Sequence, residues 1–251
     1  MDVLQSLFRW FHIVAGIIWI GHLYFFNFVN GPYQGTIDAE TKKKSNPELL
    51  PRALFWFRHG ALWTWVTGVL LLMIVFYHGQ MMFDGVQPWT AGALAMVAVT
   101  FLAFLVYDVL AKQEFAKDLK VLTPIGFVLV AIVILLDIYV GGFGYRAYVI
   151  HTGAMFGTIM AFNVWFRIWP AQQKIITAVK NGTPPDAALV AMAGARSKHN
   201  TYLSVPLVWT MINSHTVVPF AFSFVYLLIM IAAGWWLTSM FYRQAAKVKG
   251  F

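Results

Sequence analysis

Seven apolar segments, each long enough to cross a membrane, constrain the fold of this chain more than any other feature. They cover residues 4–28, 52–78, 88–110, 121–141, 146–169, 200–217 and 218–242. A helix needs about 20 apolar residues to cross the hydrocarbon core of a bilayer, and lipid leaves backbone groups no partners outside helices or closed barrels. We therefore expect an all-α fold: a polytopic membrane helical bundle of about seven transmembrane helices, forming a single domain over residues 1–251.

The positions of the basic residues predict the orientation of this bundle. If the segments cross in turn, 16 of the 18 Lys and Arg residues fall on the side opposite the N-terminus, and only Arg9 and Arg146 share its side. Loops rich in Lys and Arg remain in the cytoplasm. We expect the N-terminus outside and the C-terminus in the cytoplasm, in a bacterial inner (cytoplasmic) membrane. Topology in the lipid bilayer explains the basic surplus, so no nucleic-acid partner is expected.

Composition excludes several classes of protein. With 60% hydrophobic and 11% charged residues, the chain is far from an ordinary soluble domain, which has roughly 25% charged residues. The absence of Cys excludes disulfides, thiolate metal sites, iron–sulfur clusters and covalent c-type haem attachment in this chain.

Two segments between the spans are less apolar. Residues 29–51 contain two Pro-centred turn signals and a lysine run, which predict a solvated loop. Residues 170–199 contain an amphipathic stretch, an Asn-Gly-Thr-Pro-Pro turn and a run of small residues. They predict a cytoplasmic interfacial helical hairpin that lies on the membrane.

Histidines inside the spans are the main functional signal, because ionisable residues are costly there. His12 and His151 both lie roughly 8–9 Å below the outer surface at a helical rise of 1.5 Å per residue. Neutral imidazoles at one depth, in a chain without thiols, favour axial ligation of a b-type haem iron. We predict His12 and His151 as this pair, with His215 as the substitute partner.

The remaining intramembrane histidines leave alternatives open. His22 and His59 lie near the cytoplasmic side and are candidate ligands of a second haem, so one or two haems are expected. His199 is a further candidate ligand, or it caps a helix or contacts a lipid headgroup. Small residues near these histidines would allow a flat macrocycle to approach, although plain helix packing is the more common reason for such residues.

Four other polar residues are candidates for cofactor binding. Arg9 and Arg146 each precede a buried His, and Arg suits charge-assisted bonds to haem propionates; the alternative is that both arginines anchor helix ends. Asp108 is a candidate proton-relay group or a partner of Lys112. Asn200 is an intramembrane polar group.

Several short motifs occur in order along the chain. They are Arg9-Trp10-Phe11-His12, Val106-Tyr107-Asp108, Arg146-Ala147, His151-Thr152-Gly153-Ala154, His199-Asn200-Thr201-Tyr202-Leu203-Ser204-Val205-Pro206 and Asn213-Ser214-His215. In these motifs the chain resembles the urate oxidase N-terminal domain family, the membrane domain of bacterial membrane-bound urate hydroxylase. The resemblance implies functional roles for Arg9, His12, Asp108, Arg146, His151, His199, Asn200 and His215, and does not extend to His22 or His59.

The resemblance also implies a fused C-terminal cytochrome c that accepts electrons, and the chain departs from the family there. The sequence has no Cys-x-x-Cys-His motif after the seventh span, so we expect a stand-alone membrane redox protein. It would bind b-type haem and exchange electrons with a periplasmic cytochrome c. The alternatives are a urate hydroxylase-like oxidoreductase that uses a separate cytochrome, and a non-catalytic subunit of a larger respiratory or photosynthetic membrane complex.

Overall fold

The computed structural model describes residues 2–213 and 223–249, and every regular element in these ranges is helical. Three elements, η1, η2 and η4, are π-helical, and η3 is a short 3₁₀ turn. In chain order the elements are α1 (Asp2–Tyr24), η1 (Phe25–Asn30), α2 (Gly31–Thr36), α3 (Ala39–Leu71), η2 (Leu72–His78), α4 (Ala91–Leu110), η3 (Glu114–Lys117), α5 (Leu119–Tyr139), α6 (Tyr145–Asn163), η4 (Val164–Ile168), α7 (Trp169–Lys180), α8 (Ala187–Asn213) and α9 (Ser223–Ala245).

The segments η1 and η4 continue the α-helices on both sides of them, and η2 extends the end of α3. As a result α1, η1 and α2 form one helix of 35 residues, α3 and η2 one of 40, and α6, η4 and α7 one of 36. Single π turns inside α-helices are frequent at functional sites because they rotate the side chains that follow. In this chain each π segment carries or adjoins a polar contact between helices.

Six helices in the described part of the chain are long and apolar enough to cross a membrane. They start at Asp2, Ala39, Ala91, Leu119, Tyr145 and Ser223. The expectation of an all-helical, multi-pass membrane bundle is therefore confirmed at this level. The sixth predicted span, 200–217, overlaps α8, which is less apolar than the other six. The seventh crossing and the N-out orientation stay predictions.

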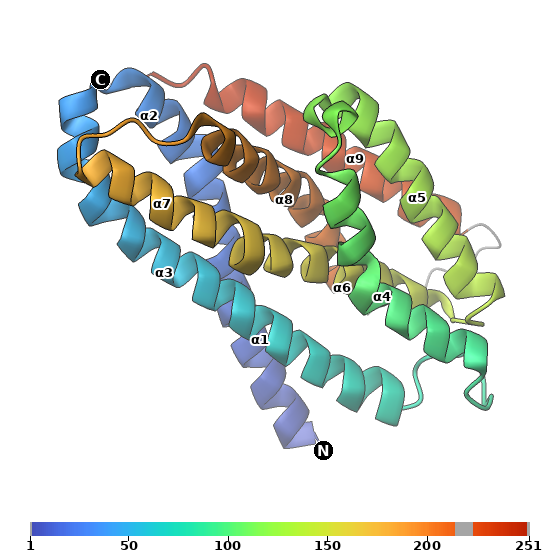
Figure 1. The fold of residues 1–251 in the computed structure, drawn as a ribbon. Coiled ribbons are helices and arrows are strands. Elements are labelled where there is room, and N and C mark those ends of the chain that lie inside the picture. The colour runs from blue at the N-terminus through green and yellow to red at the C-terminus, as the bar shows by residue number, and fades with distance from the viewer. Residues whose placement is uncertain (1, 214–222, 250–251) are drawn as a thin grey trace.

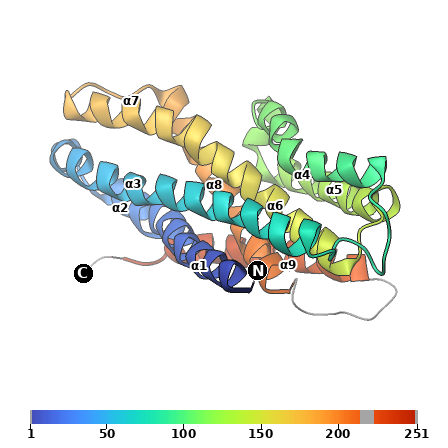
Figure 2. The same ribbon diagram turned by 90° about the horizontal axis from the view of Figure 1, so that it is seen from below.

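The helices form a bundle with α6 and α8 at its centre (Figure 1). α1 packs on α3, α6 packs on both α4 and α8, and α9 packs on α8. In both views α4 and α5 lie on one side of this centre and α1 and α2 on the other (Figure 2). In the helix from Tyr145 to Lys180, 72% of the residues in an apolar stretch of 18 are buried inside the protein; in α4 and α5 the corresponding share is 17%. The outer helices expose large apolar side chains such as Ile17, Leu105 and Trp236, as lipid-facing helices do.

The predicted solvated loop over residues 29–51 is wrong, because most of this segment is helical. α2 reaches Thr36 and α3 begins at Ala39. The Asp38 carboxylate accepts the Thr41 N–H and caps α3, which satisfies one of the free donors at a helix start. The side-chain amides of Gln34 and Asn46 donate to each other, at 2.9 and 3.0 Å, and join α2 to α3. α3 is continuous from Ala39 to Leu71 although it contains Pro47 and Pro51.

The predicted hairpin over residues 170–199 consists of α7, a turn and the first half of α8. The turn follows Lys180, with Gly182 at φ +72°, a conformation that glycine adopts without strain. Both arms continue into longer helices, since α7 extends α6 through η4 and α8 runs on to Asn213. Its position on the membrane surface stays a prediction.

Candidate functional site

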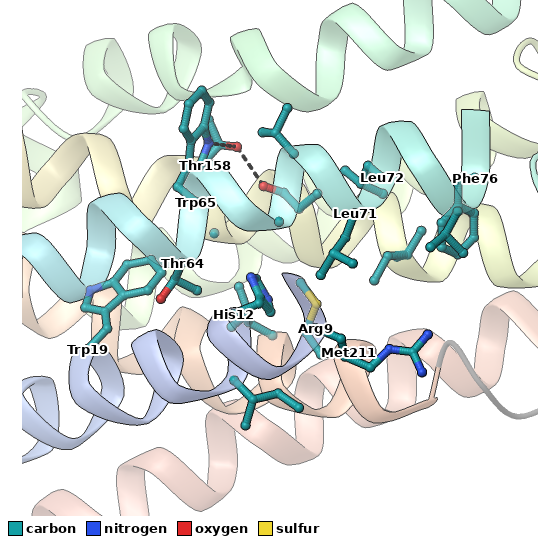
Figure 3. A pocket seen from close by; sticks show the side chains of 18 of the residues that line it. Arg9, His12, Trp19, Thr64, Trp65, Leu71, Leu72, Phe76, Thr158 and Met211 are labelled. Carbon is teal, nitrogen blue, oxygen red and sulfur yellow. Dashed lines mark hydrogen bonds between the residues drawn. The ribbon is translucent and has the colours of Figure 1, made fainter. Parts of the chain in front are cut away.

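A cavity of about 540 Å³ lies between the central helices and α1 (Figure 3). Its walls come from α1, α3, η2, α4, α6 and α8, and most of the side chains on them are apolar. The lining residues are Arg9, His12, Ile13, Trp19, Thr64, Trp65, Gly68, Val69, Leu71, Leu72, Val75, Phe76, Phe101, Ile150, Ala154, Gly157, Thr158, Leu207, Met211 and Ile212. Ligand and cofactor sites are typically cavities of roughly 300–1,000 Å³ with apolar walls and a few polar groups.

His12 is the imidazole that lines this cavity, and its hydrogen bonds define its tautomer. Its Nδ1 lies 3.1 Å from Thr67 Oγ1, and the Thr67 hydroxyl donates its single proton to the Trp63 carbonyl at 2.6 Å. Thr67 Oγ1 must then accept from His12 Nδ1–H, since a neutral imidazole has one donor and one acceptor nitrogen. This leaves a lone pair on His12 Nε2, which is the arrangement of a metal-ligating His whose other nitrogen is held by a second group.

The wall next to His12 requires a small residue. A Cβ atom at Gly68 would lie 3.0 Å from His12 Cε1, closer than carbon atoms normally approach. Trp19 also lines the cavity, and its buried Nε1 has no hydrogen-bond partner among the described residues. The two wall threonines are satisfied, because Thr64 donates to Gly60 O and Thr158 to Ala154 O.

The two predicted propionate partners are in different places. Arg9 lies one helical turn before His12 and lines the same cavity, with an exposed side chain. Arg146 lies in the first turn of α6 and does not line the cavity. The structure therefore brings Arg9 and His12 together, as the sequence suggested.

His151 is fully buried but lies outside the cavity lining. Its Nδ1 donates to Ala147 O at 2.7 Å, and its Nε2 accepts from the Tyr77 hydroxyl at 3.1 Å. His12 is hydrogen-bonded to Thr67, and His151 is hydrogen-bonded to Tyr77. Thr67 and Tyr77 are ten positions apart on the helix formed by α3 and η2, which is about 15 Å along the axis at α-helical rise. The axial pairing of His12 with His151 stays a prediction, and it would require the bond to Tyr77 to break.

Asp108 is the centre of an ion cluster between α4, η4 and α8. Arg167 donates to both carboxylate oxygens, at 2.8 and 2.5 Å. Arg196, whose side chain is 2% exposed, donates to Oδ1 at 2.8 Å, and Lys112 lies 2.7 Å from Oδ2. One carboxylate thus faces three cations, which goes well beyond the predicted pairing with Lys112.

The amide of Asn163 joins this cluster to Asn200 and His199, since its Oδ1 accepts from Arg196 Nη1 at 3.4 Å. Asn163 Nδ2 donates to Asn200 Oδ1 and to the Tyr107 hydroxyl, at 2.8 and 2.9 Å. The Tyr107 hydroxyl also lies 2.9 Å from His199 Nδ1. The structure therefore brings Asp108, His199 and Asn200 into one network, separate from the cavity. A role of this network in binding a cofactor stays a prediction.

The other predicted ligands are not assembled in the same way. His22 and His59 each donate Nδ1–H to a carbonyl one turn earlier, Ile18 O and Phe55 O, so both keep an Nε2 lone pair. His215 lies outside the described residues. Within the described ranges no group of three or more His, Asp or Glu side chains could hold a metal ion.

Sequence reasoning missed several residues that the site depends on: Thr67, Tyr77, Arg167 and Arg196. Arg196 precedes His199 by three positions, so helical spacing could have placed it on the same face. Thr67 and Tyr77 carry no such signal, because their partners come from other helices.

The family comparison covers most of the chain. The family described as Urate oxidase N-terminal matches residues 33–250. The matched range includes Asp108, Arg146, His151, His199, Asn200 and His215, and it begins after Arg9 and His12. The searches of curated proteins and of solved structures gave no significant match. By the length of the family match, the chain belongs to the Urate oxidase N-terminal family.

Proposed function

We propose that the protein is a membrane redox protein that binds a b-type haem in the 540 Å³ cavity and passes electrons to or from a periplasmic c-type cytochrome. The observation that carries this proposal is the His12 imidazole, whose Nε2 lone pair is left unused by the bond between Nδ1 and Thr67 in an apolar cavity. Imidazole is a usual axial ligand of haem iron.

The residues present fit this group. His12 would bind the iron, and Arg9 at the same wall would pair with a propionate. The bound haem would supply one-electron chemistry. The chain's own residues would set its properties: Thr67 fixes the His12 ring and increases the basicity of Nε2, and the apolar walls exclude water.

The test is a reduced-minus-oxidised absorption spectrum of protein purified after haem-replete expression. A b-type spectrum is expected in the native protein and should be lost in His12→Ala. His78→Ala is the matched control, because His78 is exposed, lies outside the cavity lining and is not among the candidate ligands. Absence of haem from the native protein, or equal haem in His12→Ala, would contradict the proposal.

Electron transfer is tested with the haem-loaded protein. Its reduced form should reduce added soluble cytochrome c at a rate that falls when His12 is replaced. Stable haem that exchanges no electrons with any of several cytochromes would argue instead for a non-catalytic subunit of a larger membrane complex.

Urate hydroxylation is the second candidate, and family membership is the observation that favours it. Electrons from urate would leave through a separate cytochrome. Membranes containing the native chain should then reduce cytochrome c only when urate is added, and membranes with the His151→Ala variant should not. Haem binding without urate-dependent reduction would separate the two candidates.

A further inference from the structure

The cavity contains a second side chain of a kind that ligates haem iron. Met211 on α8 lines the same cavity as His12 on α1 (Figure 3). Axial ligands of haem iron in proteins are His, Cys, Met or Tyr side chains. Among the described residues that line the cavity, His12 and Met211 alone are of these types.

The contacts between the first helix and α8 bring these two residues to the same end of the helix pair. Asn27 Nδ2 donates to Ser197 Oγ at 2.8 Å, and the Tyr24 and Ser204 hydroxyls lie 3.1 Å apart. An earlier residue on the first helix thus meets a later one on α8, so the two helices are antiparallel. His12 lies 15 positions before Asn27, and Met211 lies 14 positions after Ser197; counted from the Tyr24–Ser204 contact, the separations are 12 and 7 positions. Both residues therefore lie beyond these contacts in the same direction, where they line one cavity.

α6 and α8 approach closely beside the methionine, at Gly153. A Cβ atom at Gly153 would lie 2.1 Å from Thr210 Oγ1 and 3.2 Å from Met211 Cε. A larger residue at position 153 would therefore push α8 and Met211 out of their places. His151 is hydrogen-bonded to Tyr77 and Ala147 and does not line the cavity.

We infer that Met211 Sδ and His12 Nε2 are the two axial ligands of the haem, so that the iron has His–Met rather than bis-His ligation. This inference rests on the proposed function and names the second ligand of the same site. Met ligation raises the reduction potential of a haem, which would suit exchange with a c-type cytochrome.

The test compares haem-loaded native protein with Met211→Leu and Met211→His by ferric absorption spectroscopy and redox titration. The native ferric protein should show the weak far-red charge-transfer band of a sulfur–iron bond. Met211→Leu should lose this band and the low-spin spectrum. Met211→His should keep low-spin haem, lose the band and have a lower midpoint potential. Met155→Leu is the matched control, because Met155 is buried on α6 outside the cavity.

A second measurement uses the native chain, so its result does not depend on whether a variant folds. Uniform replacement of Met by selenomethionine in the native chain should shift the far-red band. An unchanged ferric spectrum and potential in Met211→Leu, or loss of the low-spin spectrum in His151→Ala, would overturn the His–Met assignment while leaving haem binding intact. A native protein without haem would instead refute the proposed function.

Discussion

Replacing Asp108 by Asn should destabilise the bundle strongly, because it removes the one carboxylate that faces three cations. The three ion pairs differ in exposure: the side chains of Lys112, Arg167 and Arg196 are 56%, 37% and 2% exposed. An exposed pair such as that with Lys112 contributes about 0–1 kcal/mol. Loss of the partner of a buried charge costs about 3–5 kcal/mol. The Arg196 contact therefore dominates, and we expect a loss of about 3–5 kcal/mol.

The assay is reversible unfolding of the purified protein in mixed micelles, followed by circular dichroism. Glu48→Gln is the control, since Glu48 and Arg52 form a pair in which both side chains are 72% exposed; no measurable change is expected there. The double variant Asp108→Asn, Arg196→Met should regain part of the lost stability, because it also removes the uncompensated charge. If Asp108→Asn is as stable as Glu48→Gln, or if the double variant is less stable than the single one, the buried Arg196 charge does not depend on Asp108 for its stability.

Two further outcomes follow from the packing and capping of α3. Gly60→Ala should cost about 1–3 kcal/mol as overpacking, because the new Cβ would lie 2.9 Å from the backbone nitrogen of Trp19. Gly21→Ala is the control: its new Cβ would meet no neighbouring group within 4 Å, and alanine favours a helix over glycine, so this variant should be at least as stable as the native protein in the same unfolding assay. Equal stabilities of the two variants would contradict the close approach of α1 and α3. Hydrogen bonds from the backbone and side chain of Thr41 hold the pKa of Asp38 below its ordinary value of 3.8, so the cap should be fully stabilising above that pH and be lost as the pH falls through the lowered pKa. Thermal melts of native protein and Asp38→Ala should differ at neutral pH and converge in acid; a constant difference would rule out the carboxylate as the cap.

Part of the site was accessible from the sequence because it depends on local spacing. Arg9 and His12 lie one turn apart on one helix, and both line the cavity. His199 and Asn200 are neighbours in sequence and take part in the same network. Asp108 was identified as a polar residue in a span, but Arg167 and Arg196, its stronger partners, are 59 and 88 positions away.

The predicted depth of the histidines shows why spacing is insufficient between helices. Counting residues from the predicted span ends placed His12 and His151 at one level, whereas their partners Thr67 and Tyr77 are ten positions apart on one helix. Helix tilt and the π segments change both the level and the direction of a side chain. Neither is visible in hydropathy.

The sequence by itself determined the all-helical membrane fold, because apolar runs of this length have no other way to satisfy their backbone groups in lipid. It also determined which polar residues would lie inside the spans. Only the tertiary structure decided which of them meet. A helix that is apolar on all sides carries no signal for which face turns inward. The packing of neighbouring helices therefore sets the rotation of each helix about its axis, and with it the position of His12 in the cavity and of His151 beside Tyr77.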